Sequence, residues 1–380
     1  ERHGQAMAVW GIGVMLGPIT GPALGGWLTD QYSWRWVFYV NLPVGVLAAI
    51  GILIFVHDTR RAHREPFDFL GFAMLSLAVG AFQLMLDRGQ LKDWFHSPEI
   101  WVEATVAALA FYLLTVHTAT ATDRSFVNRD LLKNSNFTTG TILMFFIGGI
   151  LSGSLALLPT MLQSTMQIPV LTSGLLTTPR GFGTMAAMFL VGRLINHFDT
   201  RLIIMTGLLI TAASLWQMTG FSLQMDTWPV LTSGFFQGFG LGCTFVPLNT
   251  IALSNLPRSV MTQGTALRSL MRNLGGSAGI SILEALLTRN TQIVHSRLVE
   301  TLRPDNPLMQ APALAFPYSL STPTGIAALN AEVTRQASMV AYIDDYALMM
   351  LVVLLSIPLL LLVRPPRRQS AQPATQPAGD

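Results

Sequence analysis

A few charged and amide side chains stand inside long apolar blocks, a setting in which such residues are rare outside functional sites. Glu284 is a carboxyl group in such a block, and spacings of four and seven place it on one helical face with Asn273 and Ser277. A carboxyl group withdrawn from water favours its protonated form, so Glu284 is the best candidate on this chain for loading and releasing a proton. The candidates for binding protons or polar parts of a substrate are Arg180, Arg272, Asn273 and Glu284.

Each of these positions also has a purely structural interpretation. Arg180 follows Pro179 and is either a cavity cation that binds substrate or tunes the proton carrier, or a clamp on backbone carbonyl groups. Glu284 is either a proton carrier or an outer-interface residue that faces water. Arg268, one turn before Arg272, is expected to snorkel to the cytoplasmic interface. The sequence leaves the choices for Arg180 and Glu284 open.

The elements that must position these side chains are membrane-spanning helices. Of the 380 residues, 51% are hydrophobic and 11% are charged, whereas soluble domains carry about 25% charged residues. The apolar residues form blocks of about 20, the length that crosses a hydrocarbon core of about 30 Å. Residues 134–179 contain no charged side chain. We therefore predict an all-α integral membrane protein.

Composition and motifs also argue against several other classes of protein. The formal net charge is +3, but the basic residues lie singly or in short groups beside apolar blocks, which is a topology signal and not a nucleic-acid-binding surface. The sequence contains no nucleophile elbow, P-loop or metal-ligand spacing, so we expect no enzyme, no metal site and no cofactor. The single cysteine, Cys243, lies in an apolar run and cannot form an internal disulfide. The sequence also contains no nucleotide-binding module that could couple ATP hydrolysis to another process.

Hydropathy divides the chain into ten candidate spans. They cover residues 6–28, 36–56, 68–86, 99–118, 138–162, 172–195, 202–221, 229–254, 263–287 and 342–363. Basic residues concentrate in the short loops of one side, so the positive-inside rule places that side and both ends of the chain in the cytoplasm. We expect residues 288–340 to form a partly ordered external loop and residues 364–380 a disordered cytoplasmic tail.

The opening segment combines glycine at every fourth position with two prolines. In water, Gly inside a helix costs about 1 kcal/mol relative to Ala, and Pro about 3 kcal/mol. In lipid, small residues at this spacing let two helix backbones approach closely, and neighbouring helices accommodate the kinks. The glycines are Gly13, Gly17, Gly21 and Gly25, and the prolines are Pro18 and Pro22. We predict a close, kinked helix crossing at this segment.

The same stretch, LGPITGPALGGWLTD, resembles motif C, the antiporter signature in the fifth helix of drug:proton antiporters of the major facilitator superfamily. The continuation YSWRWVFYVNLPVG resembles the start of the sixth helix in the 14-span EmrB/QacA branch. Other segments similar to that branch are LMLDRGQLKDWF, LLKNSNFTTG, GLLTTPRGFGTMAAMFLVGRLINHFDTR and GFFQGFGLGCTFVPLNTIAL. The resemblance implies the superfamily's helical bundle, with about ten of 14 helices present and the chain starting at the fifth. The motif C gate that it implies consists of Gly13, Gly17, Pro18, Gly21, Pro22, Gly25, Gly26 and Asp30.

Two further motifs are carried over by resemblance. The loop GRLINHFDTR stands where the superfamily repeats its cytoplasmic motif A, and the residues implied for a charge latch are Gly192, Arg193, Asp199 and Arg201. Asn196 stands where related sequences usually have an acid, so the latch depends on Asp199 and the two arginines. QGFGLG, with Gln237 and Gly238, resembles motif B, but Gly234 stands where motif B has Arg. That loss of charge is expected in the half of the protein that does not couple protons.

The resemblance also implies a division of the chain into domains. Residues 1–57 are the fifth and sixth helices of the N-terminal six-helix bundle, and residues 58–133 are two inserted linker helices with a cytoplasmic connector. Residues 134–363 are the C-terminal six-helix bundle, which contains the external loop at 288–340, and residues 364–380 are the tail. The principal proton-coupling residue is expected in helices one to four.

The function that the resemblance implies is multidrug efflux. A multi-pass permease of the inner membrane would export amphipathic or hydrophobic drugs by proton antiport, with its two bundles rocking around a central cavity. Partners would be the lipid bilayer and, as in Gram-negative relatives, a periplasmic adaptor protein with an outer-membrane channel; no nucleic acid is expected. The alternatives are an exporter of a specific metabolite, siderophore or lipid on the same fold, or a non-transporting membrane scaffold or receptor.

Overall fold

The computed structural model describes most of the chain. The described residues are 17, 20–55, 68–120, 131, 133–195, 197–254, 256–257, 260–302, 318 and 322–362. Every regular element among them is a helix, as the apolar blocks require, because only helices satisfy their own backbone hydrogen bonds in lipid without closing a barrel. The tail at 364–380 and most of the first candidate span lie outside the described residues.

Seven helical segments of the described part are long and apolar enough to cross a membrane. They are Trp36–Phe55, Phe69–Gly89, Pro98–Thr120, Ser135–Thr165, Thr200–Met218, Trp228–Leu253 and Pro323–Leu362. Ten spans were expected, and the difference has physical causes. The segment predicted at 172–195 is broken into α8 (Val170–Thr177) and α9 (Pro179–Leu194), because Pro179 supplies no N–H to continue the first helix. The segment predicted at 263–287 belongs to a longer and more polar helix, α12.

The larger body of the structure is a bundle of α7 (Ser135–Thr160), α8, α9, α10 (Thr200–Met218), α11 (Trp228–Ser254), α12 (Met261–Glu300) and α13 (Pro323–Ser356). Its closest crossings are built on glycine. A side chain on Gly275 of α12 would overlap the carbonyl group of Phe145 on α7, and one on Gly183 of α9 would overlap that of Phe235 on α11. Small residues therefore bring the backbones together where lipid offers little hydrophobic drive for helix association.

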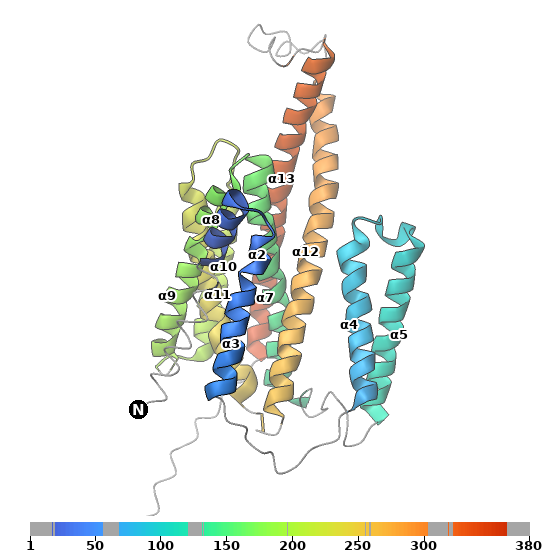
Figure 1. Cartoon of the computed structure of the whole chain (residues 1–380), viewed down its shortest axis with the longest axis vertical. Helices are drawn as coiled ribbons and strands as arrows, with labels where there is room; N and C mark the ends of the chain where they lie inside the picture. The colour runs from blue at the N-terminus through green and yellow to red at the C-terminus, as the bar shows by residue number, and fades with distance from the viewer. Residues whose placement is uncertain are drawn as a thin grey trace, which may run out of the picture.

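Helices α12 and α13 extend well beyond the rest of the bundle (Figure 1). With 40 residues, α12 is about 60 Å long, twice the thickness of the hydrocarbon core. The two helices run side by side in this extension, where Nε2 of His295 on α12 lies 3.0 Å from Oδ1 of Asn330 on α13. Within the predicted partly ordered external loop at 288–340, residues 288–300 and 323–340 are therefore helical, and each helix packs against the other; the external location stays a prediction. We call this end of the bundle the projecting end.

Two further helices form a separate hairpin beside α12: α4 (Phe69–Gly89) and α5 (Pro98–Thr120) (Figure 1). At one end of the hairpin, Arg88 forms an ion pair with Glu99. At the other end, Nε2 of His117 lies 2.9 Å from Oδ2 of Asp68. The hairpin touches the bundle through α12, where Ser281 donates a hydrogen bond of 2.6 Å to the backbone carbonyl of Leu86. That these are two inserted linker helices stays a prediction.

The chain before this hairpin forms a helix over residues 20–31, the short α2 (Trp36–Tyr39) and α3 (Asn41–Phe55). No residue of α2 or α3 is buried. Two edge-to-face aromatic pairs, Trp27 with Tyr32 and Trp34 with Phe38, lie along the connection between these helices. The first helix contacts the bundle at α8, and that contact belongs to the candidate site.

Candidate functional site

The helix at residues 20–31 crosses α8 with its backbone almost in contact. A Cβ on Gly26 would lie 3.1 Å from the carbonyl oxygen of Val170 and 3.2 Å from the Cα of Leu171. On the α8 side, a Cβ on Gly174 would overlap the carbonyl group of Pro22 and lie 3.6 Å from the Cα of Ala23. Both surfaces of the crossing therefore need glycine, because any side chain would push the two backbones apart.

The glycines that make this crossing differ from those the spacing indicated. No heavy atom of a neighbouring element lies within 4 Å of a Cβ built at Gly17, Gly21 or Gly25 in the described structure. Gly13 and Pro18 lie outside the described residues, and Asp30 is exposed and accepts a hydrogen bond of 3.0 Å from Gln31. Gly26 falls one residue after the fourfold series, so the helix presents a different face to α8 from the one that the Gly-x-x-x-Gly pattern marks.

A buried polar cluster joins three helices inside the bundle. Arg180, in the first turn of α9, donates from Nη1 to Ser154 Oγ on α7 at 3.3 Å. Ser154 in turn donates to Gln237 Oε1 on α11 at 2.8 Å. Ser154 and Gln237 have no exposed surface, and Arg180 is 8% exposed. After the break between α8 and α9, a new helix starts at Pro179. Arg180 is therefore the second residue of α9, and its side chain lies inside the bundle beside Ser154.

This cluster holds more hydrogen-bond donors than it satisfies. Arg180 Nη2 and Gln237 Nε2 are buried without a partner, and no ion pair of Arg180 occurs among the described residues. A buried cation without a counterion is costly, so it is retained for a function more readily than for stability. The hydrogen bond to a serine side chain also differs from the clamp on backbone carbonyls that was the structural alternative.

Two side chains that the sequence did not single out lie next to this cluster. Asp345 and Tyr346, in the middle of α13, are 1% and 0% exposed. Asp345 Oδ2 has no hydrogen-bond partner, and the Tyr346 hydroxyl donates to Met161 Sδ at 3.7 Å. Tyr346 interacts electrostatically with both Asp345 and Arg180. The available signal was the acidic pair in YIDDY, but it stands at the start of a predicted span, where a hydrated charge is ordinary.

The polar residues predicted on α12 are not brought together as a buried stripe. Glu284 and Asn273 are exposed in the described structure, which contradicts a buried carboxyl group at Glu284. Arg272 is half-buried, lies over the Phe245 ring with its guanidinium carbon 5.9 Å from the centroid, and is 3.5 Å from Asn273 Oδ1. Of the α12 candidates, only Arg272 therefore combines a charge with a partly buried position.

Arg268 is placed differently from the snorkelling residue that was predicted. It is 3% exposed and donates to Asn249 of α11, at 2.5 Å to Oδ1 and at 3.4 Å to the backbone oxygen. Asn249 supplies two acceptors on the facing helix, so the guanidinium is held inside the bundle and does not reach the interface. The snorkelling prediction is therefore wrong.

The predicted charge latch between α9 and α10 is a capping arrangement in the described residues. Asp199 accepts a hydrogen bond of 2.9 Å from the backbone N–H of Arg201 and so caps the start of α10. Arg193 lies over the Phe189 ring at 4.9 Å. No ion pair joins Asp199 to either arginine within the described part, and Gly192 has no neighbouring heavy atom within 4 Å of a Cβ position.

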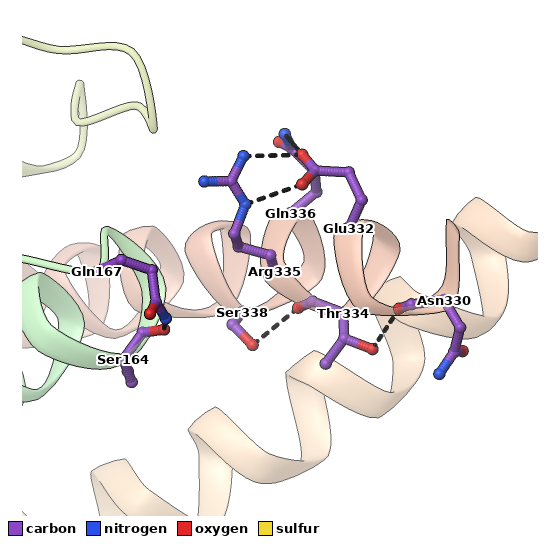
Figure 2. A network of polar contacts seen from close by, with 8 residues as sticks. All are labelled: Ser164, Gln167, Asn330, Glu332, Thr334, Arg335, Gln336 and Ser338. Carbon is purple, nitrogen blue, oxygen red and sulfur yellow. Dashed lines mark hydrogen bonds and ion pairs between the residues drawn. The ribbon is translucent and has the colours of Figure 1, made fainter. Parts of the chain in front are cut away.

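Two cavities lie near these residues. A cavity of about 530 Å³, lined mostly by polar residues, opens at the projecting end, where residues 164–167 face residues 328–338 of α13 (Figure 2). A smaller apolar cavity of about 160 Å³ lies between α7, α12 and α13; it is lined by Phe145, Phe146, Gly149, Ile150, Gly275, Ala278, Gly279, Ile282, Leu283, Leu348, Met349 and Val352. Among the described residues, no group of three or more His, Cys, Asp or Glu side chains is placed to hold a metal ion.

Comparison with known proteins identifies a family and several relatives of similar sequence. The family model described as Major Facilitator Superfamily matches residues 1–280. The chain is 33% identical over 312 residues to the multidrug export protein EmrB of Escherichia coli strain K12, covering 82% of this chain and 61% of EmrB. It is 29% identical over 370 residues to the probable multidrug resistance protein EmrY of the same strain, covering 96% of the chain and 72% of EmrY.

A third relative and a solved structure extend the comparison. The fatty acid resistance protein FarB of Neisseria gonorrhoeae is 30% identical over 363 residues, covering 95% of the chain and 71% of FarB. A crystal structure of a bacterial homologue of the human lysosomal transporter Spinster, inward-facing and unoccupied, superposes with a TM-score of 0.50 at 18% identity, covering 95% of this chain and 72% of that one. The fold is thus shared with a solved transporter, and the chain spans about three fifths of the length of EmrB.

Proposed function

Because this chain belongs to the major facilitator superfamily, we propose that the protein is an export permease for amphipathic and hydrophobic drugs. It is a multi-pass membrane protein of a transporter family and not an enzyme. In the proposed mechanism, two helical bundles rock around a central cavity, and uptake of protons down their gradient drives export of the drug. The similarity to the multidrug export protein EmrB supports this substrate class.

The observation that carries the proposal is the crossing between residues 20–31 and α8. Gly26 and Gly174 let the backbones of two different bundles meet without side chains between them. A seal of this kind closes tightly and has few interlocking side chains to pull apart when the bundles separate. We infer that it is the outer gate, and that Gly26 and Gly174, more than Gly17, Gly21 or Gly25, determine its fit.

Buried charges support the coupling to protons. Arg180 and Asp345 are both buried, neither forms an ion pair within the described part of the chain, and both act on Tyr346. Such groups are costly inside a membrane protein and mark ion or substrate pathways.

A substitution at the crossing tests the gate against a matched control. Gly174→Val places a side chain against the Pro22 carbonyl group, whereas Gly25→Val adds the same side chain where no described atom lies within 4 Å. In inverted membrane vesicles that carry the protein expressed from its complete gene, Gly174→Val should abolish proton-driven dye uptake or make the vesicles leak protons. Gly25→Val should retain coupled uptake. Normal coupling in Gly174→Val would refute this assignment of the gate.

A second candidate substrate class is fatty acids or other lipids. The chain is 30% identical to FarB, a fatty acid resistance protein. Export of a specific metabolite or siderophore would use the same fold, and a scaffold or receptor would move nothing. A panel of dyes, fatty acids and metabolites tested on cells that express the protein separates these cases: broad dye efflux supports the drug exporter, narrow efflux the specific exporter, and none the scaffold.

The proposed location is the inner membrane, with both ends of the chain in the cytoplasm and the projecting end outside. In that orientation α12 and α13 extend into the periplasm (Figure 1). If a periplasmic adaptor and an outer-membrane channel complete the pathway, the paired ends of these helices are the surface on which the adaptor would bind. Cross-linking from cysteines introduced at exposed positions such as Val299 in intact cells would test this contact.

A further inference from the structure

We propose that Asp345 is a protonation site of this protein and that the polar cavity at the projecting end supplies it with protons through Tyr342. The inference rests on the proposed proton antiport and deepens it, because it names the group that binds the proton and the side from which the proton arrives. None of these residues belongs to the glycine crossing or to the α12 candidates. Five observations on the described residues carry it.

The cavity is polar and lies at the end of the bundle that faces outward in the proposed orientation. Its wall includes Ser164 and Gln167 on one side and Thr334 and Ser338 of α13 on the other (Figure 2). A volume of about 530 Å³ is large enough for many water molecules, each of which occupies about 30 Å³ in the liquid. Protons that drive antiport come from this side of the membrane, so a hydrated cavity here is a suitable starting point.

The cavity wall contains an ion pair whose carboxylate, Glu332, is not the proton acceptor. Arg335 donates to both carboxylate oxygens of Glu332, at 2.9 and 3.0 Å, and Gln336 adds a third hydrogen bond of 2.8 Å (Figure 2). A carboxylate with three such donors is stable in its ionised form. Glu332 therefore contributes to a polar, hydrated wall, and the proton acceptor has to lie deeper.

A polar stripe on α13 leads from the cavity into the bundle. The stripe consists of four residues on one face of the helix, at spacings of four, four and three: Thr334, Ser338, Tyr342 and Asp345. The first two line the cavity, whereas Tyr342 and Asp345 are 3% and 1% exposed. The stripe thus passes from water to the interior within three helical turns.

Tyr342 connects the cavity to the carboxyl group. Its side chain lies within interaction range of Ser164 in the cavity wall and of Asp345. Ser164 lies in η2 (Met161–Thr165), a π-helical turn at the end of α7, and its hydroxyl also donates to the Thr160 carbonyl at 2.6 Å. Single π-turns of this kind occur often at functional sites, because the wider turn displaces a side chain from the ordinary helical position.

Asp345 is placed so that binding a proton removes the free-energy cost of a buried negative charge. Its Oδ2 is buried without a hydrogen-bond partner among the described residues, and a buried charge that lacks a partner is far less stable than the neutral group. Among the described residues, few titratable groups act on Asp345 or on its neighbours. On α13 they are Asp344, Tyr342 and Tyr346; from α12 Glu284 acts on Tyr342, and from α9 Arg180 acts on Tyr346.

The other helices packed against α13, namely α7 with η2 and α10, place no charged residue near Asp345. The segment of α7 and η2 contains no charged residue, and the only charged residue of α10, Arg201, stands in its first turn. Arg180 is the only cation among these groups, and it acts on Tyr346 and not on Asp345. The carboxyl group therefore favours its protonated form until a rearrangement of the bundle brings water or a cation to it.

The proton balance of the step is simple. A hydronium ion in the cavity gives a proton to the hydroxyl groups of Ser164 and Tyr342 and becomes water, and each hydroxyl passes on one proton as it accepts another. Asp345 changes from carboxylate to carboxylic acid, and both hydroxyl groups end neutral and unchanged. Release toward the other side returns Asp345 to the carboxylate, so one proton crosses for each cycle of this site.

The neighbouring aspartates provide a matched pair of variants. Asp344 is exposed and Asp345 is buried, although they are adjacent and chemically identical. The protein expressed from its complete gene would be reconstituted in liposomes, with ethidium as the transported probe and pyranine as the internal pH indicator. Asp345→Asn should lose ethidium transport driven by a pH gradient and keep ethidium exchange without a gradient, whereas Asp344→Asn should retain both. Tyr342→Phe, which keeps the ring and removes the hydroxyl, should slow proton uptake.

Each outcome has a defined meaning. Gradient-driven transport in Asp345→Asn equal to that of the unmodified protein would overturn the inference, as would equal losses in Asp344→Asn and Asp345→Asn. If the unmodified protein shows no gradient-driven transport of any tested substrate, the proposed function itself fails.

A measurement on the unmodified protein decides the question if Asp345→Asn does not assemble. Dicyclohexylcarbodiimide, an apolar reagent, modifies protonated carboxyl groups, and peptide mass spectrometry distinguishes Asp344 from Asp345. Modification at Asp345 and not at Asp344, reduced as the pH is raised, supports the inference. Modification at Asp344 alone, or at neither residue, overturns it.

Discussion

Arg180 donates a hydrogen bond from Nη1 to Ser154 Oγ at 3.3 Å, and this contact links the first turn of α9 to the middle of α7. Ser154 continues the chain to Gln237 of α11 at 2.8 Å. The three residues are far apart in the sequence and come from three helices that surround one interior point. The cluster is incomplete, since Arg180 Nη2 and Gln237 Nε2 have no partner.

Replacing Arg180 with Met should stabilise the protein while abolishing transport. A buried cation without a counterion is destabilising, and replacing buried charges with apolar residues of similar volume stabilises proteins by about 1–4 kcal/mol in favourable cases. Thermal unfolding in detergent, measured beside dye transport, checks both halves of this expectation. Arg193→Met, which changes an exposed arginine, is the control and should leave the unfolding temperature nearly unchanged. A lower unfolding temperature for Arg180→Met would contradict the expectation.

Replacing Ser154 with Ala should destabilise the bundle. Its hydroxyl is the described hydrogen-bond partner of both Arg180 and Gln237, and a buried polar group left without a partner costs about 1–3 kcal/mol. Ser296→Ala provides the comparison, because Ser296 is exposed on α12 and bonds to Ile293 of its own helix. Denaturation midpoints that are equal for the two variants would show that the cluster carries no stability.

Gly275→Ala should destabilise the contact between α7 and α12. The added methyl group would overlap the Phe145 carbonyl group, and forcing extra volume into a packed interface costs about 1–3 kcal/mol. Gly80→Ala, in the interior of α4 with no described atom within 4 Å of the new methyl group, should instead be neutral or stabilising by up to about 1 kcal/mol. The unfolding temperature should therefore fall for Gly275→Ala and stay unchanged or rise for Gly80→Ala, and an unchanged temperature for Gly275→Ala would contradict the crossing.

Ser281→Ala should loosen the hairpin of α4 and α5 without affecting the bundle. Ser281 donates to the Leu86 carbonyl at 2.6 Å, and a hydrogen bond of this kind contributes about 0.5–1.5 kcal/mol. Hydrogen–deuterium exchange should increase along α4 and remain unchanged along α10. Thr265→Ala, an exposed residue of α12 that bonds to Met261 of its own helix, is the control.

Sequence and structure agree where the physical cause is local. Apolar blocks of about 20 residues between charged loops predicted the helices at 36–56, 68–86 and 99–118, because hydrophobic length alone decides whether a segment fits a bilayer. The glycine-rich opening likewise predicted a close crossing, and its similarity to motif C indicated the family that the comparisons show. The sequence did not indicate which glycines make the contact, because the identity and angle of the partner helix decide which face is used.

What the sequence by itself determined is that this chain is a helical membrane protein of a transporter family, since composition and span length follow from residue order alone. The tertiary structure decided which polar groups lie in the interior. Asp345 and its neighbour Asp344 look alike in the sequence, and only the packing of α7, α10 and α12 against α13 buries one and exposes the other. Glu284 shows the reverse case, because its block is apolar but its helix face is open in the described residues. Burial depends on neighbours that are distant in the chain, and the cost of a charge depends on burial.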